Sequence, residues 1–239
     1  TEDSLLGIRD PLGVRPLSIG KLGDKGWILA SETTAIDHLG AQFVREVEPG
    51  EAVRLSKDGI ETIHRSSDNH LKALCLFEYI YLSRPDSVIQ NRLVYSTRHA
   101  LGRELAQEHP ANADLVIGIP DSALVAAAGY AEFSGIPYRD GLIKNRYVGR
   151  TFIEPDQRTR DLGVQVKFNP LREVLEGQRV VLVDDSIVRG TTTPHVVSLL
   201  RKAGAREVHL RVCSPPIRHP CFFGVDMGSR RELLASGRS

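Results

Sequence analysis

The stretch VVLVDDSIVRGTT, from Val180 to Thr192, constrains the fold of this chain more than any other. Its apolar start is typical of a strand buried in a sheet, and the strand runs directly into Asp184 and Asp185. Two adjacent carboxylates at the end of a buried strand repel each other unless a cation or hydroxyl groups compensate them. The Gly-Thr-Thr that follows offers backbone N–H groups and a helix start, which favour a phosphate. A solvated turn with a helix cap would explain an isolated Asp-Asp pair, but not the whole string.

Strands and helices alternate on both sides of this stretch. We predict strands at Asp114–Ile119, Arg179–Asp185 and Glu207–Cys213. We predict helices at Ser122–Gly135 and Thr192–Ala205. Such alternation is typical of an α/β fold in which helices flank a parallel sheet. Ligands of these folds bind at the carboxyl ends of the strands, where Asp184 and Asp185 are expected.

The first part of the chain is predicted to be rich in β-strands. We expect strands at Val14–Lys21 and Gly26–Ala30, a short helix at Thr33–Leu39, and a further strand pair with turns at Pro49-Gly50 and Asp58-Gly59. The polar stretch His64–His70 lacks periodicity and is predicted to be a linker. The sequence therefore predicts two domains, residues 1–66 and 67–239.

Composition excludes several classes of protein. A formal net charge of +1 gives no overall field for nucleic acid, so no nucleic-acid partner is expected. No apolar run approaches the ~18 residues of a membrane helix, so no membrane partner is expected either. The three cysteines are odd in number and widely spaced, which favours a reducing, cytoplasmic setting over a disulfide framework.

Several long motifs carry a resemblance to a known family. The string Val180–Thr192 resembles the motif with which type I phosphoribosyltransferases bind phosphoribosyl pyrophosphate (PRPP). The chain is further similar to the amidophosphoribosyltransferase family, in its iron–sulfur subclass, in the stretches CLFEYIYLSRPDS, GLIKNRYVGRTFIEP and PPIRHPCFFGVDM. The front segment, with RDPLGVRPL, resembles the C-terminal part of that family's Ntn-type glutaminase domain (glutamine amidotransferase type 2), which would be incomplete here.

The resemblance implies a set of PRPP-binding residues. They lie in the loop after the first parallel strand, in a basic flap, and in the Gly-Thr-Thr loop: Asp121, Ser122, Lys144, Arg146, Tyr147, Arg150, Lys167, Asp184, Asp185, Ser186, Arg189, Gly190, Thr191 and Thr192. Magnesium would be held by Ser122, Asp184 and Asp185. The flap, Lys144–Phe168, also contains Arg158 and Arg160, and its length favours a functional loop over a solvated surface loop.

Two features of the pyrophosphate loop and its helix leave alternatives open. The segment around Ser122 is also compatible with a capped helix that packs through small residues. The chain departs from the family at Ala123, where Gly is usual. It also departs after Gly-Thr-Thr, where Ser and then a basic or polar pair are common and this chain has Thr193, Pro194 and His195. The second departure argues against a nucleotide site near the second helix.

The cysteines are assigned by the same resemblance. Cys75 and Cys221 match two ligands of a [4Fe–4S] cluster, which requires four thiolates, and the other two are expected beyond Ser239. Without the resemblance, the sequence favours buried apolar thiols for isolated cysteines. Cys213 is interpreted as such a thiol, at the end of a strand.

The implied reaction is the first committed step of purine nucleotide synthesis. Ammonia released from glutamine displaces pyrophosphate at C1 of PRPP and gives 5-phosphoribosylamine. No cysteine lies within the first 70 residues, so the glutaminase nucleophile is expected to precede this chain. Purine nucleotides are the expected inhibitors, and a homo-oligomer, a tetramer or dimer, is expected.

The sequence argues against two rival functions. A PRPP-binding transcriptional regulator would need a basic DNA-binding module, which the near-zero net charge argues against. A base-salvage phosphoribosyltransferase would have no reason to carry RDPLGVRPL.

Overall fold

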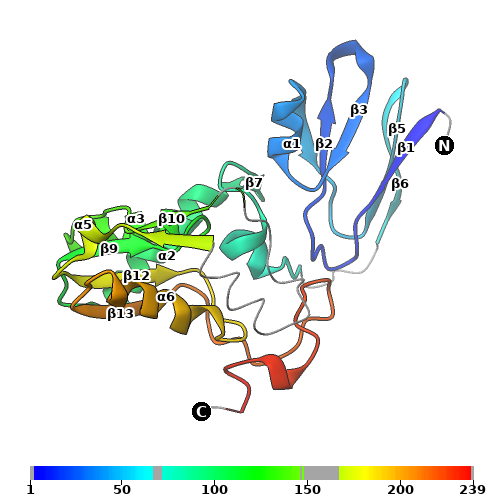
Figure 1. The fold of residues 1–239 in the computed structure, drawn as a ribbon. Helices are drawn as coiled ribbons and strands as arrows, with labels where there is room; N and C mark the ends of the chain where they lie inside the picture. The colour runs from blue at the N-terminus through cyan, green and yellow to red at the C-terminus, as the bar shows by residue number, and fades with distance from the viewer. Residues whose placement is uncertain (1–2, 67–71, 146, 148–166, 238–239) are drawn as a thin grey trace. The chain divides into compact units, whose positions relative to one another are not determined.

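The computed structural model describes residues 3–66, 72–145, 147 and 167–237 (Figure 1). The chain divides into two compact units, Thr1–Thr97 and Arg98–Ser239. This border lies beyond residue 66, where the sequence predicts a domain boundary, and the two units are described separately below. No helix among the described residues is long and apolar enough to cross a membrane.

The first unit is built from two small antiparallel sheets. One has the order β1-β5-β6, and the other has the order β3-β2-β4. Their strands are β1 (Ser4–Ile8), β5 (Glu51–Ser56), β6 (Gly59–Arg65), β2 (Ser18–Lys21), β3 (Trp27–Ala30) and β4 (Gln42–Glu46). A core of Ile19, Val47, Val53 and Leu55 packs between them, and helix α1 (Thr33–His38) follows β3.

Most of the predicted elements of this unit are present, with shifted limits. The first predicted strand begins at Ser18 rather than Val14, because the backbone N–H and carbonyl of Val14 and its neighbours serve turns and loops instead. His64 and Arg65 pair with β5 and are not linker. The rest of the predicted linker, from residue 67, lies outside the described residues.

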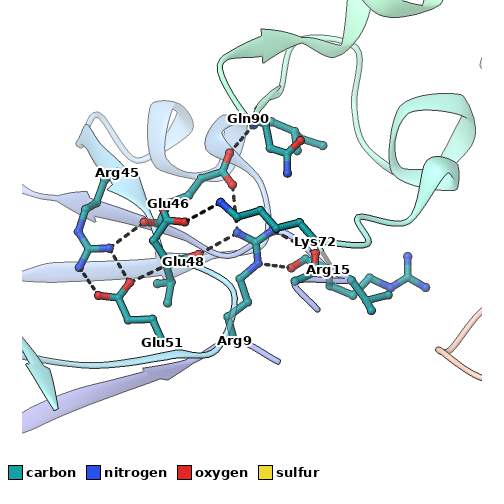
Figure 2. A network of polar contacts seen from close by, with 12 residues as sticks. Arg9, Arg15, Arg45, Glu46, Glu48, Glu51, Lys72 and Gln90 are labelled. Carbon is teal, nitrogen blue, oxygen red and sulfur yellow. Dashed lines mark hydrogen bonds and ion pairs between the residues drawn. The ribbon is translucent and has the colours of Figure 1, made fainter. Parts of the chain in front are cut away.

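A network of buried charges stabilises the first unit (Figure 2). The carboxylate of Glu51 is fully buried and accepts hydrogen bonds from Arg45 (2.7 and 2.9 Å), from the Glu48 N–H (2.8 Å) and from Thr62 (2.8 Å). Arg9 is also buried and donates to Glu46 (3.1 Å) and to the Val47 carbonyl (2.8 Å). Both charges are thus compensated at several atoms, as burial of an ion requires.

Short elements complete the first unit. A π-helical turn, η2 (Glu78–Leu82), is followed by the hairpin of β7 (Val88–Ile89) and β8 (Arg92–Leu93). Its two turn residues, Gln90 and Asn91, have positive φ angles of 49° and 59°, which is the geometry of a tight hairpin turn.

The second unit has the predicted α/β architecture. Strands β9 (Leu115–Gly118), β12 (Arg179–Asp184) and β13 (Glu207–Val212) form a parallel sheet in the order β13-β12-β9. Helices α3 (Leu124–Ser134) and α6 (Thr192–Lys202) follow β9 and β12. All five elements fall within the predicted ranges, which confirms the predicted parallel sheet with flanking helices.

Helices cover both faces of this sheet, as the alternation along β12 shows. Val180 and Leu182 pack with Val196 and Leu200 of α6. Val181 and Val183 point the other way and pack with Ala127 and Tyr130 of α3 and Leu105 of α2 (Val94–Glu108). Because both faces are buried, the strand is apolar throughout and its carboxylates can follow only at its end.

The sequence does not predict several further elements that the structure describes in this unit. They include helix α2, the hairpin of β10 (Leu142–Lys144) with β11 (Phe168–Pro170), and the one-turn helix α5 (Arg172–Leu175). Helices α2 and α3 touch through glycines: a Cβ on Gly102 would lie 1.9 Å from the Ala126 carbonyl oxygen, and a Cβ on Gly129 would lie 2.1 Å from that of His99.

Candidate active site

A pair of carboxylates marks the carboxyl end of the central strand. Asp184 is the last residue of β12, and Asp185 follows it with only 7% of its surface exposed. Asp185 accepts hydrogen bonds from the hydroxyl of Ser122 and, at 2.6 Å, from that of Ser186. One oxygen of Asp184 accepts the Asp185 N–H at 2.9 Å. Two loops and the strand end thus bring Ser122, Asp184, Asp185 and Ser186 together, as the sequence predicts.

The electrostatics of the pair favour a cation. Burial, with the neighbouring Asp185 charge, raises the pKa of Asp184 to about 7, against an opposing effect of Lys167. Burial also raises the pKa of Asp185, although hydrogen bonds from Ser122 and Ser186 and the charge of Arg98 oppose the shift. The ionised pair is therefore costly without a compensating positive charge, and a divalent cation would remove that cost.

The residue types at this strand end are compatible with magnesium. The described residues contain no group of three or more His, Cys, Asp or Glu side chains placed to hold a metal ion. Magnesium commonly takes one or two carboxylates and completes its shell with water and substrate phosphates. Ser122, Asp184 and Asp185 match that pattern.

The loop between β9 and α3 supplies the second half of the site. Asp121 is exposed and forms an ion pair with Lys144 of β10, and Ser122 reaches the carboxylate pair. The unusual Ala123 is fully buried with an ordinary φ of −87°, so it fits without strain. A Cβ on Gly118 would lie 3.0 Å from the Ala123 carbonyl oxygen, so Gly118 lets the loop approach the strand.

The loop from Ser186 to Thr191 leads into α6. Gly190 has a φ of +72°, a conformation that favours glycine, and Thr192 is the first residue of the helix. Pro194 lies in the first turn of α6, where a missing N–H costs nothing. This backbone arrangement is compatible with a phosphate-binding site at the N-terminus of α6.

The guanidinium of Arg189 faces acidic side chains of the chain. It donates to Glu232 at 2.8 and 3.1 Å, and more weakly to Asp226. These contacts leave the expected role of the Arg189 backbone in the phosphate loop untouched.

The predicted flap residues divide into three groups. Lys167 lies near Asp184 and over the ring of Phe168, with its Nζ 5.3 Å from the ring centroid. The side chain of Tyr147 is fully exposed. Arg146, Arg150, Arg158 and Arg160 lie outside the described residues.

Sequence reasoning missed Arg98 of α2. This arginine is buried, with 4% of its surface exposed, and its charge opposes the rise that burial causes in the pKa of Asp185. No motif surrounds it, so only its burial and its place beside the pair reveal it. Cys213 was expected in the core, and burial beside the two aspartates raises its pKa to about 12.

The cysteines of this chain do not complete an iron–sulfur cluster. A [4Fe–4S] cluster held by cysteines takes four thiolates, and the sequence has three cysteines. Cys213 lies beside the aspartates, while Cys75 and Cys221 belong to different compact units. Assignment of Cys75 and Cys221 as cluster ligands stays a prediction.

Comparison with known proteins places the chain in a family. Residues 91–214 match the phosphoribosyl transferase domain family. Curated amidophosphoribosyltransferases of Synechocystis and Bacillus subtilis are 52% and 54% identical to the chain over 99% and 100% of its length. The chain spans 48% and 50% of the length of these two relatives.

Solved structures give the same picture. The glutamine PRPP amidotransferase of B. subtilis complexed with ADP and GMP is 54% identical, with a TM-score of 0.90 over 100% of this chain and 52% of that one. A structure described as the allosteric regulatory enzyme of purine biosynthesis is 52% identical, with a TM-score of 0.89 over 100% of this chain and 51% of that one. The chain therefore belongs to the phosphoribosyl transferase domain family.

Proposed function

We propose that this chain carries the phosphoribosyl-transfer step of an amidophosphoribosyltransferase. Ammonia derived from glutamine attacks C1 of PRPP, the bond from C1 to the pyrophosphate oxygen breaks, and 5-phosphoribosylamine forms in purine nucleotide synthesis. Relatives with this name, about half identical over the whole chain, support the proposal.

The observation that carries the proposal is the junction of three side chains at the carboxyl end of β12. Ser122 comes from the β9–α3 loop and donates to Asp185, which follows Asp184. Carboxylates in this position accept hydrogen bonds from the two ribose hydroxyls of PRPP. Magnesium bound by Ser122, Asp184 and Asp185 would neutralise charge on the pyrophosphate leaving group.

The remaining residues bind and orient the substrate. Backbone N–H groups from Ser186 to Thr192, with the hydroxyls of Thr191 and Thr192, would bind the 5-phosphate at the start of α6. Lys144 and Lys167 bring positive charge toward the pyrophosphate side. The proposed flap would add the charges of Arg146 and Arg150 and the hydroxyl of Tyr147. Neutral ammonia needs no general base to attack.

The rest of the assignment follows from the family. We propose that residues 1–66 belong to a glutaminase-type domain and residues 67–239 to the phosphoribosyltransferase domain, in a cytoplasmic homo-oligomer, a tetramer or dimer. Purine nucleotides are proposed as feedback inhibitors, because the similar B. subtilis enzyme was solved with ADP and GMP. A [4Fe–4S] cluster would take Cys75 and Cys221 with thiolates from elsewhere.

Pyrophosphate release tests the proposal. The purified protein is given PRPP, magnesium and an ammonium salt at pH 8, so that the assay depends on the phosphoribosyl site and not on glutamine. We expect release that requires both ammonia and magnesium. Release no faster than in protein-free blanks, together with no binding of PRPP by calorimetry, would overturn the proposed function.

A further inference from the structure

The segment Val225–Leu234 contacts the Ser186–Thr191 loop at three successive residues. The Leu234 N–H donates to the Val188 carbonyl at 2.9 Å. The Arg189 guanidinium donates to Glu232 at 2.8 and 3.1 Å. A Cβ on Gly190 would lie 3.0 Å from the Leu234 side chain. Backbone, charge and apolar contacts therefore converge on the same short stretch of loop.

The acidic side of this contact is itself held in place. The Ser229 hydroxyl donates to the second oxygen of Glu232 at 2.8 Å, so both carboxylate oxygens have partners. Neighbouring Met227 and Leu233 are buried, with 5% and 4% of their surfaces exposed, and anchor the segment. Hydrogen bonds from Arg189 and then Ser229 lower the pKa of Glu232, so it stays ionised at neutral pH.

The direction of the Arg189 side chain shows whether its charge binds phosphate directly or holds the loop in place. Its guanidinium faces Glu232 and, at 3.4 Å, a carboxylate oxygen of Asp226. A charge compensated in this way contributes little as a direct phosphate ligand, but it fixes the residue between Val188 and Gly190. The loop N–H groups are then held in one arrangement before a phosphate arrives, which lowers the entropic cost of binding.

We infer that Glu232 is a positioning residue for the phosphate loop, acting through Arg189, with Leu234 as its apolar partner. The inference rests on the proposed function for its substrate, but the contact itself does not depend on it. Positioning of a loop that binds substrate and transition state alike changes KM more than kcat.

The variant Glu232→Gln tests the inference. We expect its KM for PRPP to rise about fivefold to tenfold with kcat nearly unchanged, as for loss of one charge-assisted hydrogen-bonded pair. Glu207→Gln is the matched control, because Glu207 has a similarly exposed side chain (44% against 43%) and an ion-pair partner, but lies in β13. We expect no change there.

A double variant shows whether Glu232 acts through Arg189. In the Arg189→Gln background, Glu232→Gln should add less than about twofold to KM. Fully additive effects would overturn the inference. A fall in KM for Glu232→Gln alone would overturn it too, because Glu232 would then withhold Arg189 from the phosphate.

Hydrogen exchange separates this inference from the proposed function. In ligand-free protein, amides of the Ser186–Thr191 loop should exchange at least about threefold faster in Glu232→Gln than in the wild type. If wild-type protein released no pyrophosphate but the exchange rates rose, the proposed function would fail and the contact would stand. Unchanged exchange rates would reject the positioning role whatever the activity.

Discussion

The hydroxyl of Ser122 donates a hydrogen bond to the carboxylate of Asp185, across 63 residues of sequence. This bond joins the loop after β9 to the end of β12, so one hydrogen bond links the two halves of the site directly. Asp185 is buried, and the bond from Ser122 favours its ionised form. The bond therefore both shapes the site and favours the ionised form of a proposed metal ligand.

Replacement of Ser122 should weaken magnesium-dependent binding of PRPP. We expect Ser122→Ala to raise the dissociation constant roughly tenfold or more, since hydrogen bonds to charged groups contribute about 1.5–3 kcal/mol. Isothermal titration calorimetry with and without magnesium measures it. Ser198→Ala, on the exposed side of α6, is the control and should bind normally. Equal affinities of the two variants would remove Ser122 from the site.

The raised pKa of Asp184 predicts a pH dependence of stability. In the folded protein this carboxyl titrates near pH 7, whereas its ordinary value is 3.8. The folded state therefore binds more protons between these values, and the stability of the second unit falls as pH rises from about 4 to 7. Hydrogen exchange of β12 amides, corrected for intrinsic rates, should show this decline in the absence of magnesium.

Asp184→Asn is the matched variant for this pH dependence. It should be more stable than wild type by about 2 kcal/mol at pH 8, and much closer to wild type at pH 5. The comparison is not extended below pH 5, because a second carboxyl begins to titrate there. Hydrogen bonds with Arg179 lower the pKa of Asp114 to about 2, so the stability that Asp114 contributes is lost in more acidic solution. An equal difference at both pH values would contradict the assigned titration.

Glu51 should be essential to the stability of the first unit. Burial opposes its ionisation, but hydrogen bonds from Arg45, the Glu48 N–H and Thr62 prevail and lower its pKa to about 2. Glu51→Ala leaves those donors without their acceptor and should cost about 3 kcal/mol.

Urea unfolding followed by the fluorescence of Trp27, the single tryptophan, reports on this unit. Glu61→Ala is the control: Glu61 pairs with Arg54 at the surface, with 57% of its side chain exposed, and should cost less than about 1 kcal/mol. A small effect at both positions would show that the buried network is not stabilising.

The glycine contacts between α2 and α3 predict a steric cost. A methyl group on Gly102 would overlap the Ala126 carbonyl oxygen, so Gly102→Ala must push the helices apart and should destabilise the second unit by about 3 kcal/mol. Gly228→Ala serves as control, because nothing lies within 4 Å of its added carbon and its φ is not positive. Thermal unfolding by circular dichroism compares them, and equal midpoints would argue against this packing.

The parallel sheet could be predicted because its signals are local. The strands around Val181 and Ile117 are short apolar runs, and the helices after them end at Gly135 and near Gly204. Helix α2 escaped prediction because Arg98 and Gly102 interrupt its buried face between Val94 and Leu105, so the sequence shows no continuous apolar stripe. Strands β10 and β11 have three residues each, too few to show periodicity.

The site was predictable in part for the same reason. Asp184 and Asp185 lie in one contiguous motif, and Ser122 lies in another that ends a neighbouring strand. The direction of Arg189 depends on Glu232, 43 residues away, and the effect of Arg98 depends on helix packing. Such contacts arise only from tertiary structure, so local patterns carry no trace of them.

The most direct test of the account is the rate of ammonia-dependent pyrophosphate release from PRPP in Asp184→Asn, measured beside the wild type. Both proteins are assayed at pH 8 with saturating magnesium, and circular dichroism confirms that the variant is folded. The account predicts a fall of at least about a hundredfold in kcat/KM, because the carboxylate pair would bind both the ribose and the metal. A folded variant that keeps more than about a tenth of the wild-type value would contradict it.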